Sequence, residues 1–330
     1  ILVCLVGSEM CIRDSSEVAE GLGVEIYPGF SAAEVLFNDD NSVKGVATGD
    51  MGVSKEGSAK ESWEAGMELH AKYTLFSEGT RGSLSKFLIN NFNLSENKDF
   101  QKYAIGLKEV WEIKEENFSE GLVEHSLGWP LSDGTNGGSF LYHFDKNLVS
   151  VGYVIHLNYT NPYASPFDEF QQFKTHPSIK KILKGGKRLS YGARAITTGG
   201  FQSVPKLNFP GGALIGCSAG FLNYPKIKGT HNAMESGMLA AEAIIENSLI
   251  ENTVNDLENY QVKYEKSRIF TELKKVRNIK PYQTRYGPLL GTVLSGIDMW
   301  LTTFGLTMPF TLSHNKPCLL YTSDAADDTC

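Results

Sequence analysis

The residues best suited to chemistry lie between positions 211 and 244, where an apolar run, a loop of small residues and a helix-forming run follow one another. The apolar run is typical of a buried strand that ends at Gly216, where the missing side chain lets the backbone approach a ligand. A helix is expected from Gly229, and its free N–H groups and positive dipole end suit an electron-rich, partly anionic group. Ala233, Gly237, Ala240 and Ala241 keep one face of this helix small, so that it could pack tightly on a sheet or a ring. A well-packed helix with an ordinary N-cap is an equally good alternative.

A second candidate is the segment 75–86, in which an apolar strand is followed by Glu78, Gly79 and the start of a helix. This order is typical of a turn that contacts a nucleotide at the edge of an α/β sheet. The motif is short, and a plain strand-to-helix turn is the alternative.

The third candidate is the glycine pair Gly137-Gly138, which opens an aromatic strand within residues 129–144. Two glycines offer N–H groups without side-chain bulk, so a flat ring that carries carbonyl groups could hydrogen-bond directly to the backbone. Taken alone, the residues favour a simple turn, because Asn-Gly is strong turn chemistry. Apolar walls for such a ring could come from Trp129, Phe140 and Tyr142, although such side chains are more often part of a core.

The fourth candidate is residues 287–310, which are apolar or small except for Asp298. The length could span a bilayer, but the glycines, Pro309 and the central carboxylate argue against a spanning helix. We expect residues 288–309 to dip into one leaflet, with Trp300 at the interface. A buried core helix and a spanning helix remain the alternatives.

The elements that position the first two candidates predict an α/β sheet. A helix over 17–22 should end at Gly23, followed by strands over 24–29, 32–39 and 42–49. Residues 39–42 carry turn chemistry, and the polar stretch that follows suits a longer hairpin. A strand over 73–79 and a helix over 80–92 complete the strand–turn–helix order of a nucleotide-binding sheet.

The glycine pair should belong to a different kind of sheet. Four runs rich in aromatic and β-branched residues, at 102–113, 121–130, 138–144 and 148–159, predict antiparallel strands. Helices are expected near 166–175 and 177–184, which makes this an inserted domain. The α/β pattern returns near residue 213, with helices over 229–248 and 254–275.

The two ends of the chain do not continue the patterns beside them. Residues 1–15 and 318–330 resemble translated sequencing-adapter read-through, with a short signal peptide as the alternative for the first, and we leave both out of the fold argument. The ends carry four of the seven net negative charges, so the inner chain, at −3, is nearly balanced and does not suggest a nucleic-acid partner. They also hold Cys4, Cys11, Cys318 and Cys330, which leaves Cys217 alone, without a disulfide framework or a metal-binding cluster. The histidines show no zinc-type spacing either.

From about residue 16 to 317 the chain resembles the electron-transfer flavoprotein–ubiquinone oxidoreductase family, most specifically in IGCSAGF (215–221) and PKIKGTHNAM (225–234). The wider flavoprotein class usually has Gly-Asp where this chain has Gly216-Cys217, and the departure is in keeping with this family. The resemblance implies FAD as cofactor. A reduced flavin ring is an electron-rich group of the kind that a helix start suits.

The resemblance assigns two sets of residues. The flavin environment takes Gly79, Gly216, Cys217, Gly229, Thr230 and His231. The alternative for Cys217 is a small buried hydrophobe that meets the flavin only through its backbone. The ubiquinone site takes Gly137 and Gly138, because the matching pair in the family contacts the quinone carbonyl. We assign no catalytic acid.

The expected fold is an α/β, Rossmann-like FAD-binding domain with an inserted α+β, antiparallel-sheet domain that binds ubiquinone. We expect the FAD-binding domain over 16–98 and again over 201–250, the ubiquinone-binding domain over 99–200, and a helical, membrane-associating segment over 251–317.

Two family features have no counterpart in these residues. A glycine-rich G-x-G-x-x-G turn, which lies upstream of residue 16 in the family, and the four-cysteine 4Fe–4S module, which lies downstream of 317, are both missing. The chain is therefore expected to be a fragment that does not turn over alone and binds FAD poorly.

The parent enzyme should pass electrons from reduced electron-transfer flavoprotein, through a 4Fe–4S cluster and FAD, to ubiquinone at a membrane surface. The surface would be the inner face of a bacterial cytoplasmic membrane, or the matrix side of the mitochondrial inner membrane in a eukaryote. One alternative is a related flavoprotein that reduces isoprenoid double bonds or hydroxylates aromatic rings. Another is an inert truncated product that rests on membranes.

Overall fold

The computed structural model describes residues 14–131, 134–159, 161–250 and 256–314. Most of both adapter-like ends, four of the five cysteines and the first two residues of the helix expected over 254–275 lie outside these ranges. Residues 14–21 are helical and Gly23 has a φ of 91°, in agreement with the expected helix end.

A small sheet unites segments that are far apart in the chain. It consists of β6 (Thr74–Phe76), β12 (Asn208–Phe209) and β13 (Gly212–Leu214), in the order β12-β13-β6. Strand β13 runs parallel to β6, with Leu214 opposite Phe76. Helix α2 (Ser83–Asn91) follows β6 and helix α5 (Thr230–Ile250) follows β13, which confirms the two expected strand–turn–helix units. The second strand ends two residues before Gly216, which begins a 3₁₀ turn, Gly216–Ser218.

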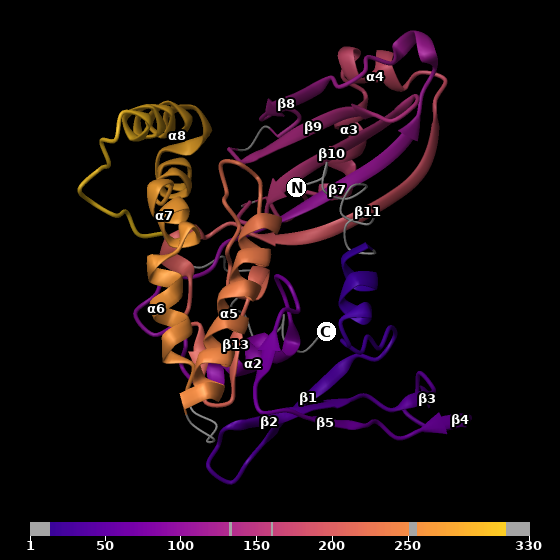
Figure 1. Ribbon diagram of the computed structural model, residues 1–330. Helices are drawn as coiled ribbons and strands as arrows, with labels where there is room; N and C mark the ends of the chain where they lie inside the picture. Colours follow the sequence, from indigo (N-terminus) through magenta and orange to yellow (C-terminus); the bar gives the residue numbers. More distant parts are fainter. Residues whose placement is uncertain (1–13, 132–133, 160, 251–255, 315–330) are drawn as a thin grey trace.

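A second sheet lies at the bottom of Figure 1 and has the order β1-β2-β5. Strands β1 (Ala32–Phe37) and β2 (Val43–Thr48) are joined by the expected turn, in which Ser42 N donates to Asp40 Oδ1 at 2.9 Å. Strand β5 (Glu68–His70) pairs with β2, and β3 (Met51–Val53) and β4 (Ala59–Glu64) form the longer hairpin. The strand expected over 24–29 is wrong, because these residues form an exposed loop that turns at Pro28-Gly29.

The inserted sheet is antiparallel throughout, in the order β11-β7-β10-β9-β8 (Figure 1). Its strands are β7 (Tyr103–Glu112), β8 (Val123–Leu127), β9 (Gly137–Phe144), β10 (Leu148–His156) and β11 (Lys187–Thr197). The first four match the expected runs, whereas β11 was not expected. Tyr103 and Thr197 are opposite each other, so the chain enters and leaves this sheet at one place.

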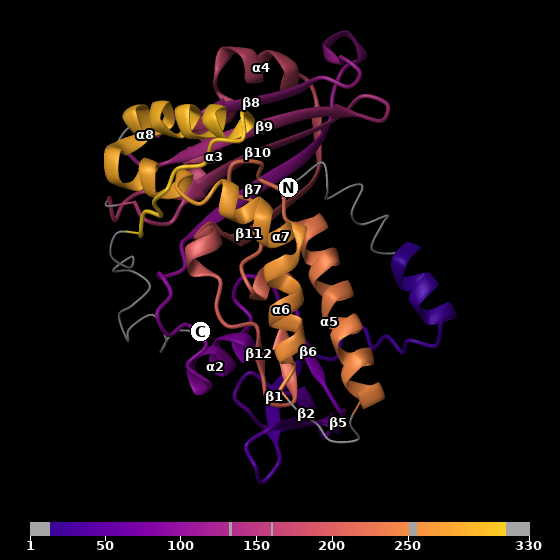
Figure 2. The ribbon, with the colours of Figure 1, turned by 60° about the vertical axis from the view of Figure 1, so that its left-hand side comes forward.

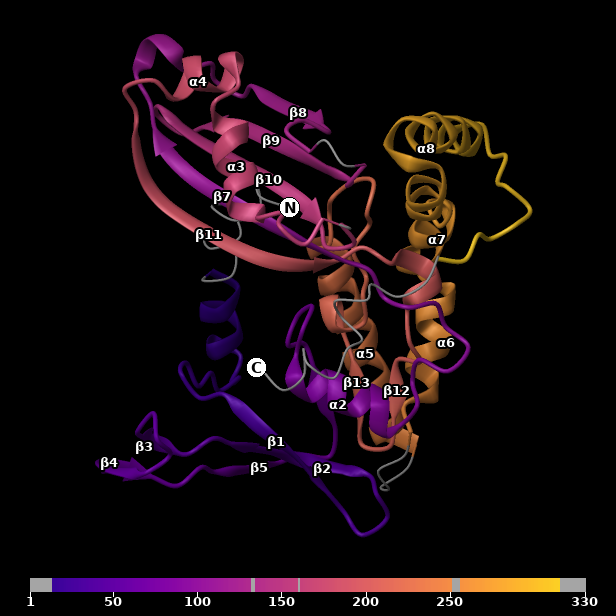
Figure 3. The same cartoon turned by 180° about the vertical axis from the view of Figure 1, so that it is seen from behind.

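Helices α3 (Pro166–Lys174) and α4 (Pro177–Leu183) cover one face of the inserted sheet, as Figure 3 shows from behind. Phe170 and Phe173 of α3 are buried against Leu141, Val151 and other sheet residues. Burial of such side chains supplies the main favourable term that holds helix to sheet.

Helix α5 and the helix that follows it in the chain stand side by side next to the small sheet (Figure 2). The helix expected over 254–275 is two helices, α6 (Glu258–Lys266) and α7 (Arg268–Lys275). They separate at Ser267, whose ψ of 168° is not helical and whose Oγ accepts from Phe270 N at 3.3 Å. Their buried faces join α5, α2 and the small sheet in one core that includes Phe76, Phe209, Leu214 and Tyr260.

Helix α8 (Ile279–Thr303) covers most of the segment expected to meet a membrane. It bends at Gly287, where φ is 75°, so that Gly291 packs against its own first arm. A Cβ at Gly291 would lie 2.6 Å from Gln283 Cα. Among the residues that the structure describes, no helix combines the length and the apolarity needed to cross a bilayer.

Candidate functional site

The two turns that sequence assigns to a nucleotide meet at one edge of the small sheet. Because β6 and β13 are parallel neighbours, their carboxyl ends lie together, and Ile215 N donates to Phe76 O at 3.1 Å. Beyond this bond, Ser218 Oγ donates to Gly79 O at 3.2 Å. Gly79 and Gly216 have φ values of 85° and 60°, which L side chains rarely adopt. The backbone therefore forms a corner with two buried glycines, at positions that only glycine accommodates without strain.

The start of α5 closes this corner from a third side. Ser236 is fully buried, and its Oγ accepts from Gly216 N at 2.9 Å. Asn232, also fully buried, donates from Nδ2 to Phe221 O at 2.9 Å. These bonds fix the loop 216–221 against the first turns of the helix. The first amides of a helix have no acceptor within the helix, so Thr230 and its neighbours give the corner a positive end.

His231 lies at this helix start, but its side chain points elsewhere. Its Nε2 is 3.0 Å from Glu272 Oε1 on α7. The same carboxylate accepts from Asn223 Nδ2 at 2.7 Å and pairs with Lys226 at 3.3 Å. Burial tends to raise the pKa of Glu272, but the bonds from Asn223 and His231 and the nearby charges outweigh burial and lower it. The His231 side chain thus helps to hold the loop that contains Asn223 and Lys226. Only its backbone remains available for the flavin contact that the sequence suggested.

Arg194 of β11 is a member of the corner that sequence reasoning missed. A Cβ at Gly79 would lie 3.1 Å from Arg194 Nη2. The end of β11 is tied to the same turn, because Thr80 Oγ1 donates to Ala195 O at 3.1 Å. Burial raises the pKa of the Cys217 thiol, and the Arg194 charge partly opposes that rise. The corner therefore combines a helix start with an exposed guanidinium, and both favour a negatively charged ligand.

The glycine pair lies inside a strand and not in a turn. Gly137 and Gly138 begin β9, opposite Ile155 and Val154 of β10. A Cβ at Gly137 would lie 2.7 Å from Val154 O, and one at Gly138 would lie 2.6 Å from Ser126 O. The simple-turn alternative is therefore wrong, and close approach of the neighbouring strands is itself one reason for glycine at both positions.

The two faces of β9 have different surroundings. Side chains alternate along a strand, so Phe140 and Tyr142 share the face of Gly138, away from α3. Their rings stack with centroids 5.4 Å apart. His125 of β8 packs edge-on against Tyr142, and its pKa is lowered by burial and then by the charge of Lys228. Lys228 precedes Gly229, so the loop before α5 comes close to this aromatic face.

Trp129 does not join Phe140 and Tyr142. Its ring lies 5.1 Å from that of His176, the residue before α4. Its carbonyl oxygen accepts from Tyr153 OH at 3.0 Å, and Tyr153 belongs to the face that α3 covers. Of the three aromatic residues considered as walls, the structure brings two together.

A chain of contacts connects the glycine pair with the loop that leads to α5. Asn136 directly precedes the glycine pair, and its carbonyl oxygen accepts a hydrogen bond from His156 N at 3.0 Å. The His156 ring packs against Tyr224, with centroids 5.3 Å apart. Tyr224 lies in the loop before Gly229. The two predicted sites are therefore linked through the side chains of His156 and Tyr224.

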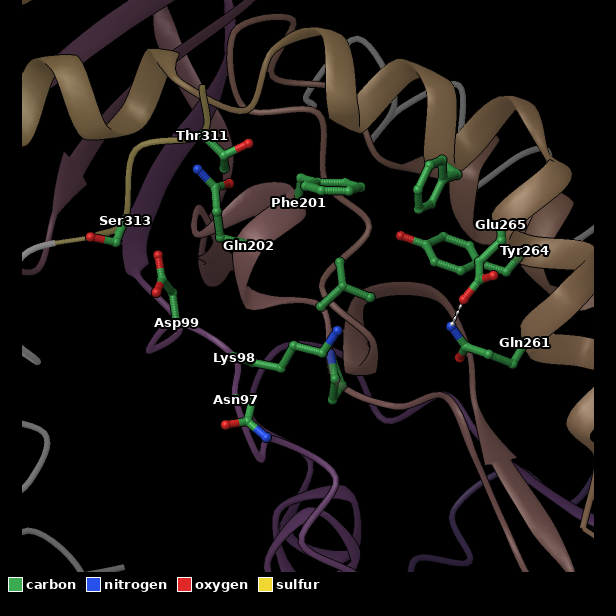
Figure 4. A pocket seen from close by; sticks show the side chains of 13 residues that line it. Asn97, Lys98, Asp99, Phe201, Gln202, Gln261, Tyr264, Glu265, Thr311 and Ser313 are labelled. Carbon is green, nitrogen blue, oxygen red and sulfur yellow. Dashed lines mark hydrogen bonds between the residues drawn. The ribbon is translucent and has the colours of Figure 1, made fainter. Parts of the chain in front are cut away.

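A cavity of about 360 Å³ lies elsewhere, between the loop at residues 97–99, the turn at 201–205, helices α6 and α7 and residues 311–313. Figure 4 shows Asp99, Gln202 and Tyr264 along its wall. None of the residues that sequence assigned to a cofactor or a quinone lines this cavity.

Comparisons with known proteins identify relatives of this chain. Residues 103–196 match the family model described as ETF-QO, ubiquinone-binding. The mitochondrial electron transfer flavoprotein-ubiquinone oxidoreductase of Homo sapiens is 52% identical over 306 residues, which cover 90% of this chain and 49% of that protein. The Pseudomonas aeruginosa protein of the same name is 50% identical over 315 residues, covering 94% of this chain and 57% of the relative.

Solved structures show the same fold at low sequence identity. A geranylgeranyl bacteriochlorophyll reductase-like protein from Thermoplasma acidophilum superposes with a TM-score of 0.56 and 15% identity, over 91% of this chain and 68% of that one. A flavin-dependent brominase gives a TM-score of 0.53 and 16% identity, over 86% and 64% of the two chains. At this identity the likeness concerns the fold alone, and it agrees with the expected α/β domain with an inserted antiparallel sheet. The chain spans about half the length of the curated relatives it matches. Over nine tenths of its length the chain is similar to electron transfer flavoprotein-ubiquinone oxidoreductases, and residues 103–196 match the ubiquinone-binding family model.

Proposed function

We propose that the complete protein carrying this chain transfers electrons from reduced electron transfer flavoprotein, through a 4Fe–4S cluster and FAD, to ubiquinone. The observation that carries the proposal is the convergence of the Gly79 turn, the Gly216 turn and the start of α5 at one corner, which lies close to the glycine pair of β9. The identity of about one half to oxidoreductases of that name supports the choice of reaction.

The corner fits a flavin for three physical reasons. Gly79 and Gly216 have backbone conformations that other residues rarely adopt, and the absence of a side chain at both positions would let a flat ring approach the backbone. The amides at 229–231 and the Arg194 guanidinium offer positive charge to the edge of a reduced flavin. FAD would supply the redox chemistry, whereas the chain orients the ring and stabilises its charge. Cys217 would act through its backbone, since burial raises the pKa of its thiol and keeps the sulfur protonated.

The iron–sulfur cluster has no site among the described residues. Cys217 is the free cysteine in that part of the chain, and a cluster of this type takes four thiolates. The cluster therefore rests on the family resemblance and requires residues other than those described.

Ubiquinone would meet the chain at residues 99–200, the proposed ubiquinone-binding domain, with 16–98 and 201–250 as the flavin-binding part. The N–H groups of Gly137 and Gly138 would donate to a quinone carbonyl, and Phe140 and Tyr142 would flank the ring from the same sheet face. The loop before α5, which contains Lys228, would lie between this ring and the corner formed by Gly79, Gly216 and the start of α5.

The second arm of α8 suits a membrane surface. Its outward residues are strongly exposed and apolar, with Leu289 85% exposed, and they include Val293, Ile297, Trp300 and Phe304. Asp298, the one charge of the segment, is 4% exposed and turned inward, and burial raises the pKa of its carboxyl. We propose that this arm lies in one leaflet, on the inner face of a bacterial cytoplasmic membrane or the matrix side of the mitochondrial inner membrane.

The Gly138→Val variant of the complete enzyme tests the proposal. Its side chain should reduce the rate of ubiquinone reduction by about tenfold or more, which corresponds to roughly 1.4 kcal/mol, while flavin absorbance and flavin content stay unchanged. Gly192→Val is the matched control, because Gly192 lies on the same sheet face and a Cβ there meets only Lys108 Cε at 3.8 Å. Unchanged quinone kinetics in Gly138→Val would reject the assignment. Nicotinamide-dependent reduction of an isoprenoid, without quinone reduction, would favour the alternative activity.

A further inference from the structure

A buried pair of basic side chains lies next to the glycine pair. Lys280, at the start of α8, is 3% exposed, and His156, at the end of β10, is 4% exposed. Lys280 Nζ and His156 Nδ1 are 2.7 Å apart. The Lys280 ammonium also lies 5.3 Å from the centroid of the Tyr224 ring, whose hydroxyl donates to Gln283. Neither Lys280 nor His156 is among the residues proposed to contact the flavin.

The imidazole lies on the sheet face that carries Gly138. His156 is opposite Ala104 of β7, and side chains alternate along β10, so His156 and Val154 share one face. Val154 is opposite Gly138. The His156 amide is fixed by Asn136 O, at 3.0 Å, so the ring is held one step beyond the glycine pair.

The surroundings of the pair favour loss of a proton. Four titratable groups bear on Lys280 from the segments around it: Lys102, His156, Tyr224 and His314. Burial and then the charge of Lys102 lower the pKa of Lys280 to about 7. Burial and the charge of Lys280 hold the pKa of His156 well below its ordinary value. Asp99 is an acidic residue of this neighbourhood: its Oδ2 accepts from His314 N at 2.7 Å, and its charge tends to raise the pKa of His314.

The hydrogen bond fixes the tautomer of His156 when Lys280 is charged, because an ammonium group can only donate. A neutral imidazole that accepts at Nδ1 carries its own proton at Nε2. Lys280, as an ammonium, donates to Nδ1. A proton can therefore leave the imidazole at one nitrogen while another arrives from the lysine at the other nitrogen.

We propose that Lys280 and His156 form an internal proton relay for the acceptor held at Gly137 and Gly138. This inference rests on the proposed function, in which two electrons reach the quinone from reduced flavin. As a quinone oxygen gains negative charge, a new O–H bond forms and the Nε2–H bond of His156 breaks. Nδ1 takes a proton from Lys280, which becomes a neutral amine. Water returns a proton to Lys280 and supplies the second proton of the quinol.

The relay predicts a pH profile that a structural role would not produce. In the complete enzyme, reduced in advance and mixed with a short-chain ubiquinone, the rate of quinone reduction should fall as the pH rises through about 7. Lys280→Met should remove this pH dependence and slow the step about 100-fold, within the usual range for a general acid. Lys280→Arg should not restore the rate, because arginine keeps its proton.

Two further lysines serve as controls. Lys102→Met should move the fall in rate to higher pH, because it removes a positive charge that lowers the pKa of Lys280. Lys266 is exposed on α6, so the Lys266→Met variant should leave the rate of quinone reduction and its pH profile unchanged. A wild-type rate and profile in Lys280→Met would overturn the relay and leave the proposed function standing. Absence of quinone reduction in the wild-type enzyme would overturn both.

A measurement without turnover covers the case in which the variants do not fold. With lysine labelled with ¹³C at Cε, an NMR titration of the wild-type protein should show one lysine with a pKa near 7, far from the ordinary value of about 10.4. If all lysines of the wild-type protein titrate near the ordinary value, the relay is rejected.

Discussion

Replacing Lys280 by methionine should change how stability depends on pH. The pKa of Lys280 in the folded protein is about 7, against 10.5 for an ordinary lysine. Between these two values the unfolded chain binds more protons at this site than the folded protein does. Stability therefore rises with pH over this window, and the unfavourable effect of the buried charge is fully present below about pH 7.

The size of the effect follows from the same two values. A shift of about 3.5 units corresponds to a cost of roughly 5 kcal/mol at low pH, at about 1.4 kcal/mol per unit. Between about pH 7 and about pH 9, the wild-type protein should regain roughly 2 kcal/mol of this cost. Methionine has no charge to bury, so Lys280→Met should be relatively more stable near pH 7 and lose about half of that advantage by about pH 9.

Urea unfolding followed by tryptophan fluorescence, repeated across this pH range, measures the difference between the two proteins. Groups that titrate alike in both proteins cancel in the difference, and Lys266→Met provides a surface control. If the stabilities of wild type and Lys280→Met run parallel from about pH 7 to about pH 9, the buried ammonium has no such cost and the reasoning fails.

Two other substitutions test the fold around the site. Gly211→Ala should destabilise the protein by about 2 kcal/mol or more, measured as the shift in the urea midpoint, because Gly211 has a φ of 79° and a Cβ there would collide with Val43 O. Glu109→Ala should cost about 3–5 kcal/mol by the same measurement, because it leaves Lys174, 2.8 Å from the carboxylate and largely buried, without its partner. Glu112→Ala, at an exposed position of the same strand, should change little. An unshifted midpoint for Gly211→Ala, or equal effects at the two glutamates, would contradict these explanations.

Local patterns in the sequence were enough to predict much of the fold. The turn between β1 and β2, the helices after β6 and β13 and the first four strands of the inserted sheet were expected from their residues. Each of these signals is contained within a few neighbouring residues, such as Asp40 and Ser42, whose bonds form within the turn itself.

Other elements depend on contacts that sequence does not display. Residues 24–29 are as apolar as a strand, but in the described structure they remain an exposed loop. Strand β11 is mostly exposed and polar, and it exists because it pairs along nearly the whole of β7. The break at Ser267 required knowledge of its side-chain bond to Phe270 N.

The candidate site was predictable only where glycine spacing marked it. Gly79, Gly216 and Gly229 indicated the corner, but no local pattern marks Arg194, which reaches the corner through the sheet. The same holds for Lys280 and His156, whose 2.7 Å contact joins residues far apart in the chain. Within the sequence each is an ordinary basic residue, and only the fold makes the pair unusual.

The shared entry and exit of the inserted sheet has a consequence for folding. The strands β6 and β13 must find each other across the whole insertion, and the entropy lost in closing a loop grows with its length. Because Tyr103 and Thr197 are opposite each other, an insertion that folds first already holds its two ends together. Strands β6 and β13 then pair as if a much shorter stretch of chain separated them, which lowers the entropy lost on pairing.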